Sequence, residues 1–153
     1  MTTRRSRRRF LAAAAAGALA AHVRLAGAQL TVQPLEPLIA KITGGATVRA
    51  GRVALDIPRL ADNGHAVPLA IRVESPMSER DFVKSIHVLS ERNPRPLIAA
   101  FHLTPHAGRA DISTRVRLNG SQRLVVLAAL SDGTWWSGEA EVEVTETACL
   151  DAT

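Results

Sequence analysis

The residue whose chemistry stands out is a single cysteine close to the C-terminus. Cys149 is the only cysteine among 153 residues and the fifth residue from the end of the chain. One cysteine excludes an intrachain disulfide, a CxxC redox pair and a multi-cysteine zinc or iron–sulfur site. An exposed free thiol is a liability in an oxidising compartment unless it has a use. Because chain ends are mobile, the position of Cys149 favours a thiol on an arm, and an incidental terminal cysteine is the alternative.

The other candidate ligands are four histidines, His65, His87, His102 and His106. The last two are four residues apart, but Pro105 and Gly108 exclude the helix that would place them on one face. The pattern therefore favours surface and turn histidines over a metal site. The sequence also lacks a G-x-S-x-G elbow and a Gly-rich phosphate loop. We predict no catalytic residue, no cofactor-binding residue and no metal ligand.

Two further features lie in one alternating stretch, residues 134–145. Glu139, Glu141 and Glu143 share one face of a strand there, opposite inward-pointing valines. The carboxylates form a cation site, an interaction stripe or a solvated face that discourages edge pairing, and the last is favoured. Trp135 and Trp136 point to opposite sides of the same strand. The outward tryptophan is either an interface anchor or partly buried against a neighbouring loop.

Alternating apolar residues predict the elements that must position these side chains. Seven short strands are expected, at residues 51–57, 67–73, 82–89, 96–103, 110–118, 123–130 and 134–145. Turn signals separate them, at Asp62-Asn63-Gly64, Asn93-Pro94, Pro105-His106-Ala107-Gly108, Asn119-Gly120 and Asp132-Gly133. A short helix is expected at residues 34–42, ended by Gly44-Gly45. Residues 124–130 are nearly all apolar, which predicts a central strand buried on both faces. Together these elements predict an antiparallel β-sandwich.

The first 28 residues have the composition of an export signal. An Arg-rich start and an apolar run precede Ala26-Gly27-Ala28, and the stretch from Ser6 to Leu11 matches the twin-arginine pattern. The apolar run, about 12 residues and mostly alanine, is too short to span a membrane core of about 30 Å. We therefore predict cleavage after Ala28 and export to the bacterial periplasm by the twin-arginine route.

The basic charge of the chain belongs to this leader. Six of the 19 Lys and Arg residues, and none of the 14 Asp and Glu residues, precede residue 29, which leaves 13 cations against 14 acids. A high apparent pI of this origin does not indicate nucleic-acid or membrane binding. The remaining length corresponds to one domain. We divide the chain into a signal peptide (1–28), a sandwich domain (29–145) and a cysteine-bearing arm (146–153).

Six segments of the chain form a recognisable set: Glu74-Ser75-Pro76-Met77, Val83-Lys84-Ser85-Ile86-His87-Val88, Asn93-Pro94-Arg95-Pro96, Ala107-Gly108-Arg109-Ala110, Ser113-Thr114-Arg115-Val116-Arg117-Leu118 and Ser131-Asp132-Gly133-Thr134-Trp135-Trp136-Ser137-Gly138. Taken together, they resemble the SoxY family, the sulfur-carrier subunits of the periplasmic sulfur-oxidation (Sox) system. The resemblance runs from about Ile42 to Cys149 in the family's order and spacing.

This resemblance implies an immunoglobulin-like sandwich, a flexible C-terminal arm and a heterodimer with a second sandwich protein, SoxZ. It also implies that Cys149 is the site of covalent sulfur attachment. In the family, a c-type haem partner couples thiosulfate oxidatively to the thiol and a dimanganese hydrolase removes sulfate. The carrier catalyses nothing itself and needs no cofactor. It presents each intermediate to one enzyme after another.

The arm departs from the family pattern. The family has Gly-Gly-Cys-Gly-Gly after its valine and threonine, whereas this chain has Thr147-Ala148-Cys149-Leu150-Asp151. The spacing from Val144-Thr145 to the cysteine is kept, but all four glycines are replaced, which makes the arm bulkier and stiffer. Nearby acidic residues also disfavour a thiolate and repel anions such as thiosulfate.

Three hypotheses follow for the function. The first is a periplasmic sulfur carrier with a SoxZ-like partner. The second is a non-catalytic SoxY-like interaction module whose arm has lost carrier function. The third is an intermolecular disulfide through Cys149.

Overall fold

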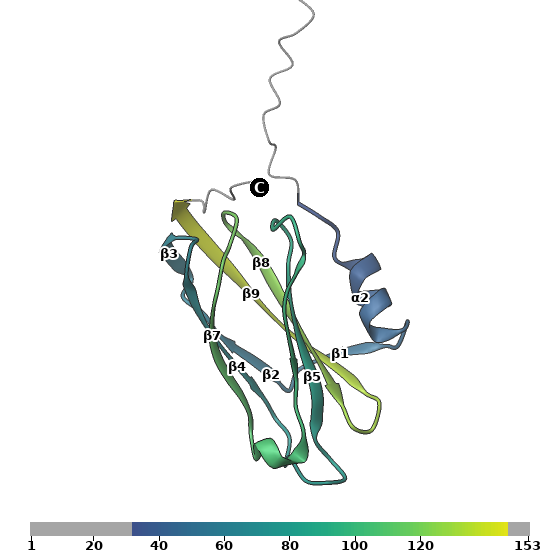
Figure 1. Cartoon of the computed structure of the whole chain (residues 1–153). Helices are drawn as coiled ribbons and strands as arrows, with labels where there is room; N and C mark the ends of the chain where they lie inside the picture. Colours follow the sequence, from purple (N-terminus) through teal and green to yellow (C-terminus); the bar gives the residue numbers. More distant parts are fainter. Residues whose placement is uncertain (1–31, 147–153) are drawn as a thin grey trace, which may run out of the picture.

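The computed structural model describes residues 32–146, which form two packed β-sheets and one helix (Figure 1). The larger sheet contains, in spatial order, β1 (Val48–Ala50), β9 (Trp135–Glu146), β8 (Gln122–Leu130), β5 (Val83–Ser90) and β6 (Leu97–His102), and β3 (Leu60–Asn63) also pairs with β9. The smaller sheet contains β2 (Val53–Asp56), β4 (Val67–Val73) and β7 (Ala110–Val116). A 3-10 turn, η1 (Pro105–Ala107), joins β6 to β7. The predicted β-sandwich is confirmed.

The core lies between the two sheets and is built by the alternation visible in the sequence. In β4 the buried residues are Val67, Leu69, Ile71 and Val73, and they meet residues such as Ile86 and Val126 of the larger sheet. β8 has β5 on one side and β9 on the other, and every residue from Leu124 to Leu130 is buried. The prediction of a central strand buried on both faces is therefore confirmed, since one face meets the smaller sheet and the other meets the helix.

The helix α2 (Glu36–Thr43) covers the outer face of the larger sheet. Leu35, just before it, is 1% exposed and packs with Leu89, Val125 and Leu127. The helix begins with a proline in its first turn and ends at Gly44 (φ 64°), a left-handed position that glycine adopts without steric cost. The observed helix lies within two residues of the predicted range. It adds a third, partial layer to the sandwich.

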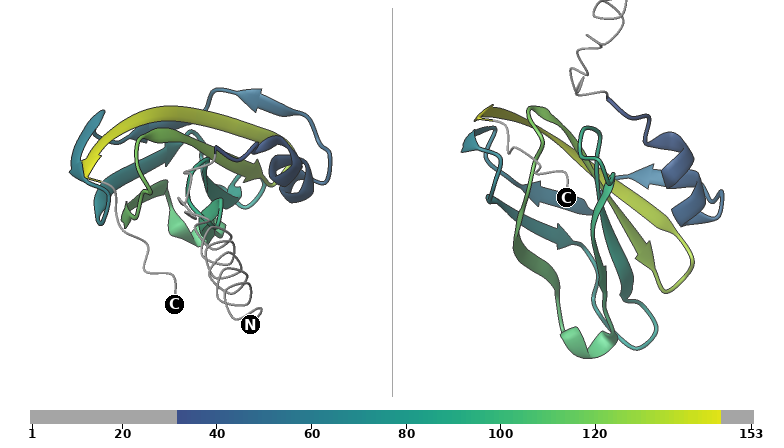
Figure 2. Two further views of the ribbon diagram at one scale, coloured as in Figure 1. Left: turned by 90° about the horizontal axis from the view of Figure 1, so that it is seen from above. Right: turned by 45° about the horizontal axis from the view of Figure 1, so that its top comes forward.

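The sequence analysis missed two strands. Both of them pair in parallel with a neighbour, whereas antiparallel pairing was predicted. β1 and β3 are three and four residues long and pair in parallel with the two ends of β9. Asp62 and Asn63, which we predicted to form a turn, belong to β3. Segments this short carry too little alternation to be recognised, and they are extended because β9 offers hydrogen-bonding partners. Figure 2 shows the two ends of β9 lying beside α2 and beside β3.

Gly138 of β9 leaves room for β2, the strand by which the chain passes from the larger sheet to the smaller one. A Cβ atom built at this glycine would lie 2.4 Å from the carbonyl oxygen of Val53 and 2.7 Å from Cδ1 of Leu55. Both contacts belong to β2, which crosses β9 between the positions of β1 and β3. The close approach of the two backbones therefore requires the absence of a side chain at residue 138.

We predict that Gly138→Ala lowers the free energy of unfolding by about 2–3 kcal/mol, since the added carbon meets a backbone oxygen that cannot rotate away. Urea unfolding of the purified mature protein measures the change. Ser137→Ala, at the neighbouring position of the same strand, is the matched control and should cost less than half as much. Equal stabilities of Gly138→Ala and the parent protein would contradict the close packing of β2 on β9.

Candidate functional site

Cys149 lies outside the described residues, as do the leader and most of the predicted arm. The structure does describe the strand that leads to the cysteine. β9 continues to Glu146, three residues before Cys149, so it includes the first residue that we assigned to the arm. We call residues 143–146 the arm root, because any arm that carries the thiol begins there.

One edge of the arm root is paired with β3. The parallel register aligns Leu60 with Glu143 and Ala61 with Val144, and the amide of Glu143 donates to the carbonyl of Arg59 at 2.8 Å. The hydroxyl of Thr145 donates to the carbonyl of Asp62 at 2.5 Å. This edge is thus secured by backbone and side-chain bonds.

The opposite edge of the arm root is held by a serine. β8 begins at Gln122, which lies opposite Val142, so β9 extends beyond the end of β8. Ser121 immediately precedes Gln122 and so lies just beyond the end of β8. Its hydroxyl accepts a hydrogen bond from the amide of Val144 at 2.9 Å and donates to the carbonyl of the same residue at 3.4 Å.

A buried amide network lies directly beneath this serine. Ser90, Asn93, Asn119 and Gln122 are each less than 10% exposed. The side chain of Asn93 accepts from the amide of Asn119 at 2.9 Å and donates to the carbonyl of Arg117 at 2.7 Å. The amide of Gln122 reaches the carbonyl of Gly120 at 3.2 Å, and its oxygen accepts from Ser90. Since a buried polar group without a partner is costly, the network fixes the β5–β6 loop against the β7–β8 turn.

A surface groove of about 440 Å³ adjoins the arm root. Its lining includes Arg59, Leu60, Ser121, Arg123, Glu141 and Glu143. Leu60 is 58% exposed, unusually open for a leucine. The groove therefore combines both charges with an apolar side chain beside the strand that leads to Cys149.

The predicted row of glutamates is present on the outer face of β9. Glu141 and Glu143 are exposed, and their neighbours Val142 and Val144 are buried. Glu139 forms an ion pair with Arg123 at 3.0 Å, and Arg123 also binds Glu91 at 2.7 Å. β9 is paired along both edges, so the row does not protect an edge strand as we expected.

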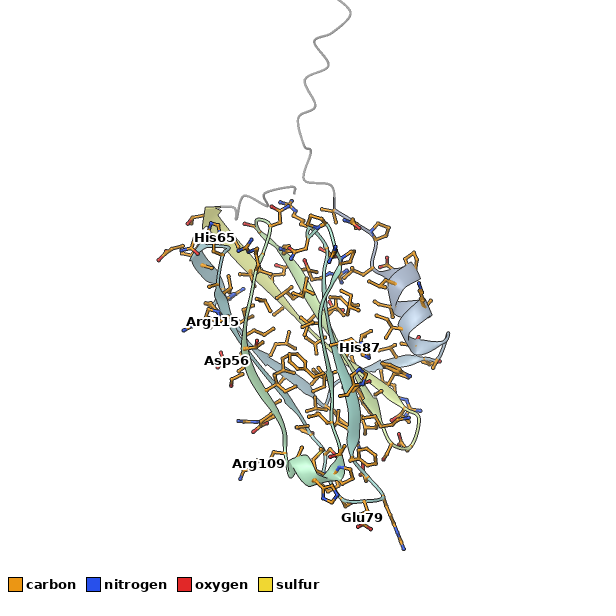
Figure 3. All side chains as sticks on the ribbon, viewed as in Figure 1. Asp56, His65, Glu79, His87, Arg109 and Arg115 are labelled. Carbon is orange, nitrogen blue, oxygen red and sulfur yellow. The ribbon has the colours of Figure 1, made fainter. Side chains whose placement is uncertain are left out.

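Three of the four candidate histidines are exposed, as predicted. His65 follows β3, His102 is on β6 and His106 is in η1. Figure 3 shows His65 near the end of β9 and His87 about midway along β5, so the two are not brought together. No group of three or more His, Cys, Asp or Glu side chains within residues 32–146 is arranged to hold a metal ion.

His87 differs from this surface pattern because it is half-buried. Its ring lies 5.9 Å from that of Trp135 and 6.3 Å from that of His102, between centroids. Nε2 is 3.1 Å from the hydroxyl of Ser85, and the buried Nδ1 has no hydrogen-bond partner among residues 32–146. Burial, followed by electrostatic repulsion from His102, lowers the pKa of His87. The folded state therefore disfavours the protonated form of this ring.

Both tryptophans are partly buried, and partial burial against a neighbouring loop was the second of the alternatives raised by the sequence. Trp135 packs beside the cluster under α2. Trp136 is half-buried at the rim of the sandwich, next to Gly51, with the guanidinium groups of Arg49 and Arg52 at 5.7 and 4.9 Å from its ring. Neither ring projects freely from the surface.

Comparison with known proteins identifies the family of the chain. A family model described as "Sulfur oxidation protein SoxY" matches residues 39–149, well over half of the sequence. The chain belongs to the SoxY family. Among solved structures, it is similar to the sulfur carrier protein SoxY from Chlorobium limicola f thiosulfatophilum, with 25% identity and a TM-score of 0.62 over 72% of this chain and 96% of that one. No curated protein matches the sequence.

More distant structures share the fold alone. A superoxide reductase (neelaredoxin) from Ignicoccus hospitalis is 14% identical, with a TM-score of 0.55 over 78% of this chain and 98% of that one. A superoxide reductase from Nanoarchaeum equitans is 13% identical, with a TM-score of 0.53 over 63% of this chain and all of that one. Membership of the SoxY family makes this chain a sulfur-oxidation protein of the carrier type.

In this SoxY-family chain, sequence reasoning missed the residues that organise the arm root. Asn93 and Asn119 were interpreted as turn signals only, and Ser121 was not considered. The hydrogen bond that joins the two asparagines connects residues 26 apart in the sequence. A local pattern cannot reveal such a pairing. The signal that was available is two turn asparagines that each precede a strand, which shows their local role but not their contact.

Within the described part of this SoxY-family chain, no helix has both the length and the apolar character that crossing a membrane requires.

We predict that the stability of the protein falls as the pH drops below about 6.5, the pKa of an unperturbed histidine. The pKa of His87 is lower in the folded state than in the unfolded chain, so the unfolded chain binds the proton first. The stability contributed by neutral His87 is full above that pH and is lost as the pH falls through the folded pKa.

Urea unfolding between about pH 8 and about pH 5 tests this. His87→Gln should flatten the pH dependence of the unfolding free energy, and His65→Gln, at an exposed site, should leave it as in the parent protein. If the unfolding free energy of His87→Gln depended on pH as steeply as that of the parent protein, the assignment of the pH dependence to His87 would be contradicted.

Proposed function

We propose that this protein is a sulfur carrier that binds sulfur-oxidation intermediates covalently on Cys149 and presents them to partner enzymes. The observation that carries the proposal is the extent of the family match, which continues past the sandwich to residue 149, the position of the sole cysteine. The likeness to a sulfur carrier protein over 96% of its length supports the same function.

The chemistry needs a thiol and no other group from this chain. Coupling the outer sulfur of thiosulfate to the Cys149 thiolate forms one sulfur–sulfur bond and releases two electrons, which a c-type haem enzyme accepts. Hydrolysis by a dimanganese enzyme then releases sulfate and leaves the second sulfur on the cysteine. Thiolate attack requires a clear approach to the sulfur, so the proposal requires that the Cys149 thiol be accessible to the partner enzymes. The carrier has no catalytic role in either step.

The proposed partner in the complex is a SoxZ-like sandwich protein, and the proposed compartment is the periplasm. The family match supports the partner. The twin-arginine pattern and the Ala26-Gly27-Ala28 sequence support export and cleavage after Ala28. The haem and manganese enzymes would bind transiently, when the arm presents its sulfur.

A second candidate is favoured by the arm sequence. Thr147, Ala148, Leu150 and Asp151 stand where the family has glycines. An interaction module that keeps the fold and the SoxZ-like partner but carries no sulfur would tolerate these changes. The same arm would also permit an intermolecular disulfide through Cys149.

Intact-mass spectrometry of protein purified from the periplasm of cells grown on reduced sulfur tests the carrier function. We expect a chain that starts at Gln29 and bears an added sulfur or thiosulfonate on its C-terminal peptide. Cys149→Ser should abolish the adduct and leave circular dichroism and thermal stability unchanged, because the residue follows the last strand of the sandwich in the sequence.

An unmodified thiol, or only a disulfide-linked dimer, would refute the carrier function and favour the second candidate. A variant with glycines at positions 147, 148, 150 and 151 provides the matched comparison. If the carrier works in the thiosulfate cycle of the family, this variant should accept sulfur faster than the parent protein.

We also predict a stable heterodimer with a SoxZ-like protein encoded beside this chain. The sandwich has open edge strands, among them β6 of the larger sheet and β7 of the smaller one, and such edges need to be covered or blunted. Co-expressed proteins should elute together from gel filtration, and Cys149→Ser should not change the elution. Separate elution of the two chains at micromolar concentration would speak against the partnership.

A further inference from the structure

We propose that Ser121 is a positioning residue that sets the length of the arm carrying Cys149, by keeping the arm root inside the sheet. The inference rests on the proposed function, because the length of the arm matters only if Cys149 presents a group to a partner.

β9 is longer than its neighbour β8 at the arm root. The last residue of β9 that β8 pairs with is Val142, and β9 continues to Glu146. Without a substitute for β8, this edge of the arm root would be open. Ser121 is that substitute, since its hydroxyl accepts from the amide and donates to the carbonyl of Val144. One hydroxyl can serve as both donor and acceptor, so it replaces the two backbone groups of a missing strand residue.

The β7–β8 turn that carries Ser121 is held rigidly. Ser121 lies between Gly120 and Gln122, and both of these residues take part in the buried amide network. Gly120 has φ 83°, a left-handed conformation, and its carbonyl is bound by the side chain of Gln122 at 3.2 Å. Leu118, in the same turn, donates its amide to the carbonyl of Gly64 at 2.8 Å. The turn is thus hydrogen-bonded to two other loops at this end of the sandwich. Ser121 therefore stays in place if β9 moves away from it.

The point at which the chain leaves the sheet limits how far Cys149 can reach. An extended residue spans at most about 3.6 Å, so three residues beyond Glu146 allow a reach of at most about 11 Å. If the strand separated up to Val142, seven residues would span about 25 Å. For a flexible tether, this lengthening lowers the effective concentration of the thiol near the root about three- to fourfold. The hydroxyl of Ser121 therefore favours delivery to an active site that approaches this end of the sandwich closely.

The sole cysteine makes the inference testable without a partner. A nitroxide spin label on Cys149 of the full mature chain reports the mobility of the arm, and hydrogen exchange reports the opening of the arm root. In Ser121→Ala we expect the Val144 amide to exchange about five- to tenfold faster, the loss expected for one hydrogen bond. The spectrum of the label should narrow at the same time. Amides in the middle of β8, such as that of Val126, should exchange at the parental rate.

Two variants serve as controls. Ser121→Thr keeps the hydroxyl and should restore both the exchange rate and the spectrum. Ser113→Ala removes an exposed serine from β7 and should change neither. Parental exchange at Val144 in Ser121→Ala would overturn the proposal, and so would equal acceleration at Val126, which would show general destabilisation. These readouts do not depend on sulfur, so loss of the adduct with an intact Ser121 effect would refute the carrier function alone.

Discussion

The fold depends on a single strand that is hydrogen-bonded along both edges. β9 pairs with β8 over most of one edge, and the other edge is divided between β1 at its start and β3 at its end. Between those two short strands the chain leaves the sheet as β2 and lies against β9 so closely that residue 138 has no room for a side chain. The larger sheet, the crossing to the smaller sheet and the exit of the C-terminal segment are therefore all defined relative to β9.

This arrangement separates a rigid part of the molecule from the part that carries the thiol. The buried amides of Asn93, Asn119 and Gln122 join the β5–β6 loop to the β7–β8 turn at the end where β9 finishes. Such a network is stable only when every member is satisfied, so it specifies one geometry for that end. The groove beside it has Leu60 exposed and both charges on its walls. The last described residues of the chain are therefore held in one place relative to the sandwich.

Local patterns predicted seven of the nine strands found within residues 32–146, including β2 with four residues and β6 with six. β4 was predicted to the residue and the glutamate face of β9 was predicted correctly, because both depend on a period of two along the chain. β1 and β3 were missed, since three or four residues next to a partner about 80 positions away leave no periodic signal. The same holds for Ser121, whose role comes from a contact with Val144. Cys149 could be singled out from sequence because a lone cysteine near a chain end is informative without any contact.

The position of β9 in the chain also determines the order in which the protein can assemble. β1, β3 and β8 all pair with β9, the last strand within residues 32–146, and the bond from Thr145 to Asp62 spans 83 residues. Contacts between such distant parts of a chain form slowly. The nascent polypeptide cannot complete its larger sheet until β9 has been synthesised. Until then, β1, β3 and one edge of β8 lack their final neighbour, and this period is when the chain has the greatest need of protection from premature association.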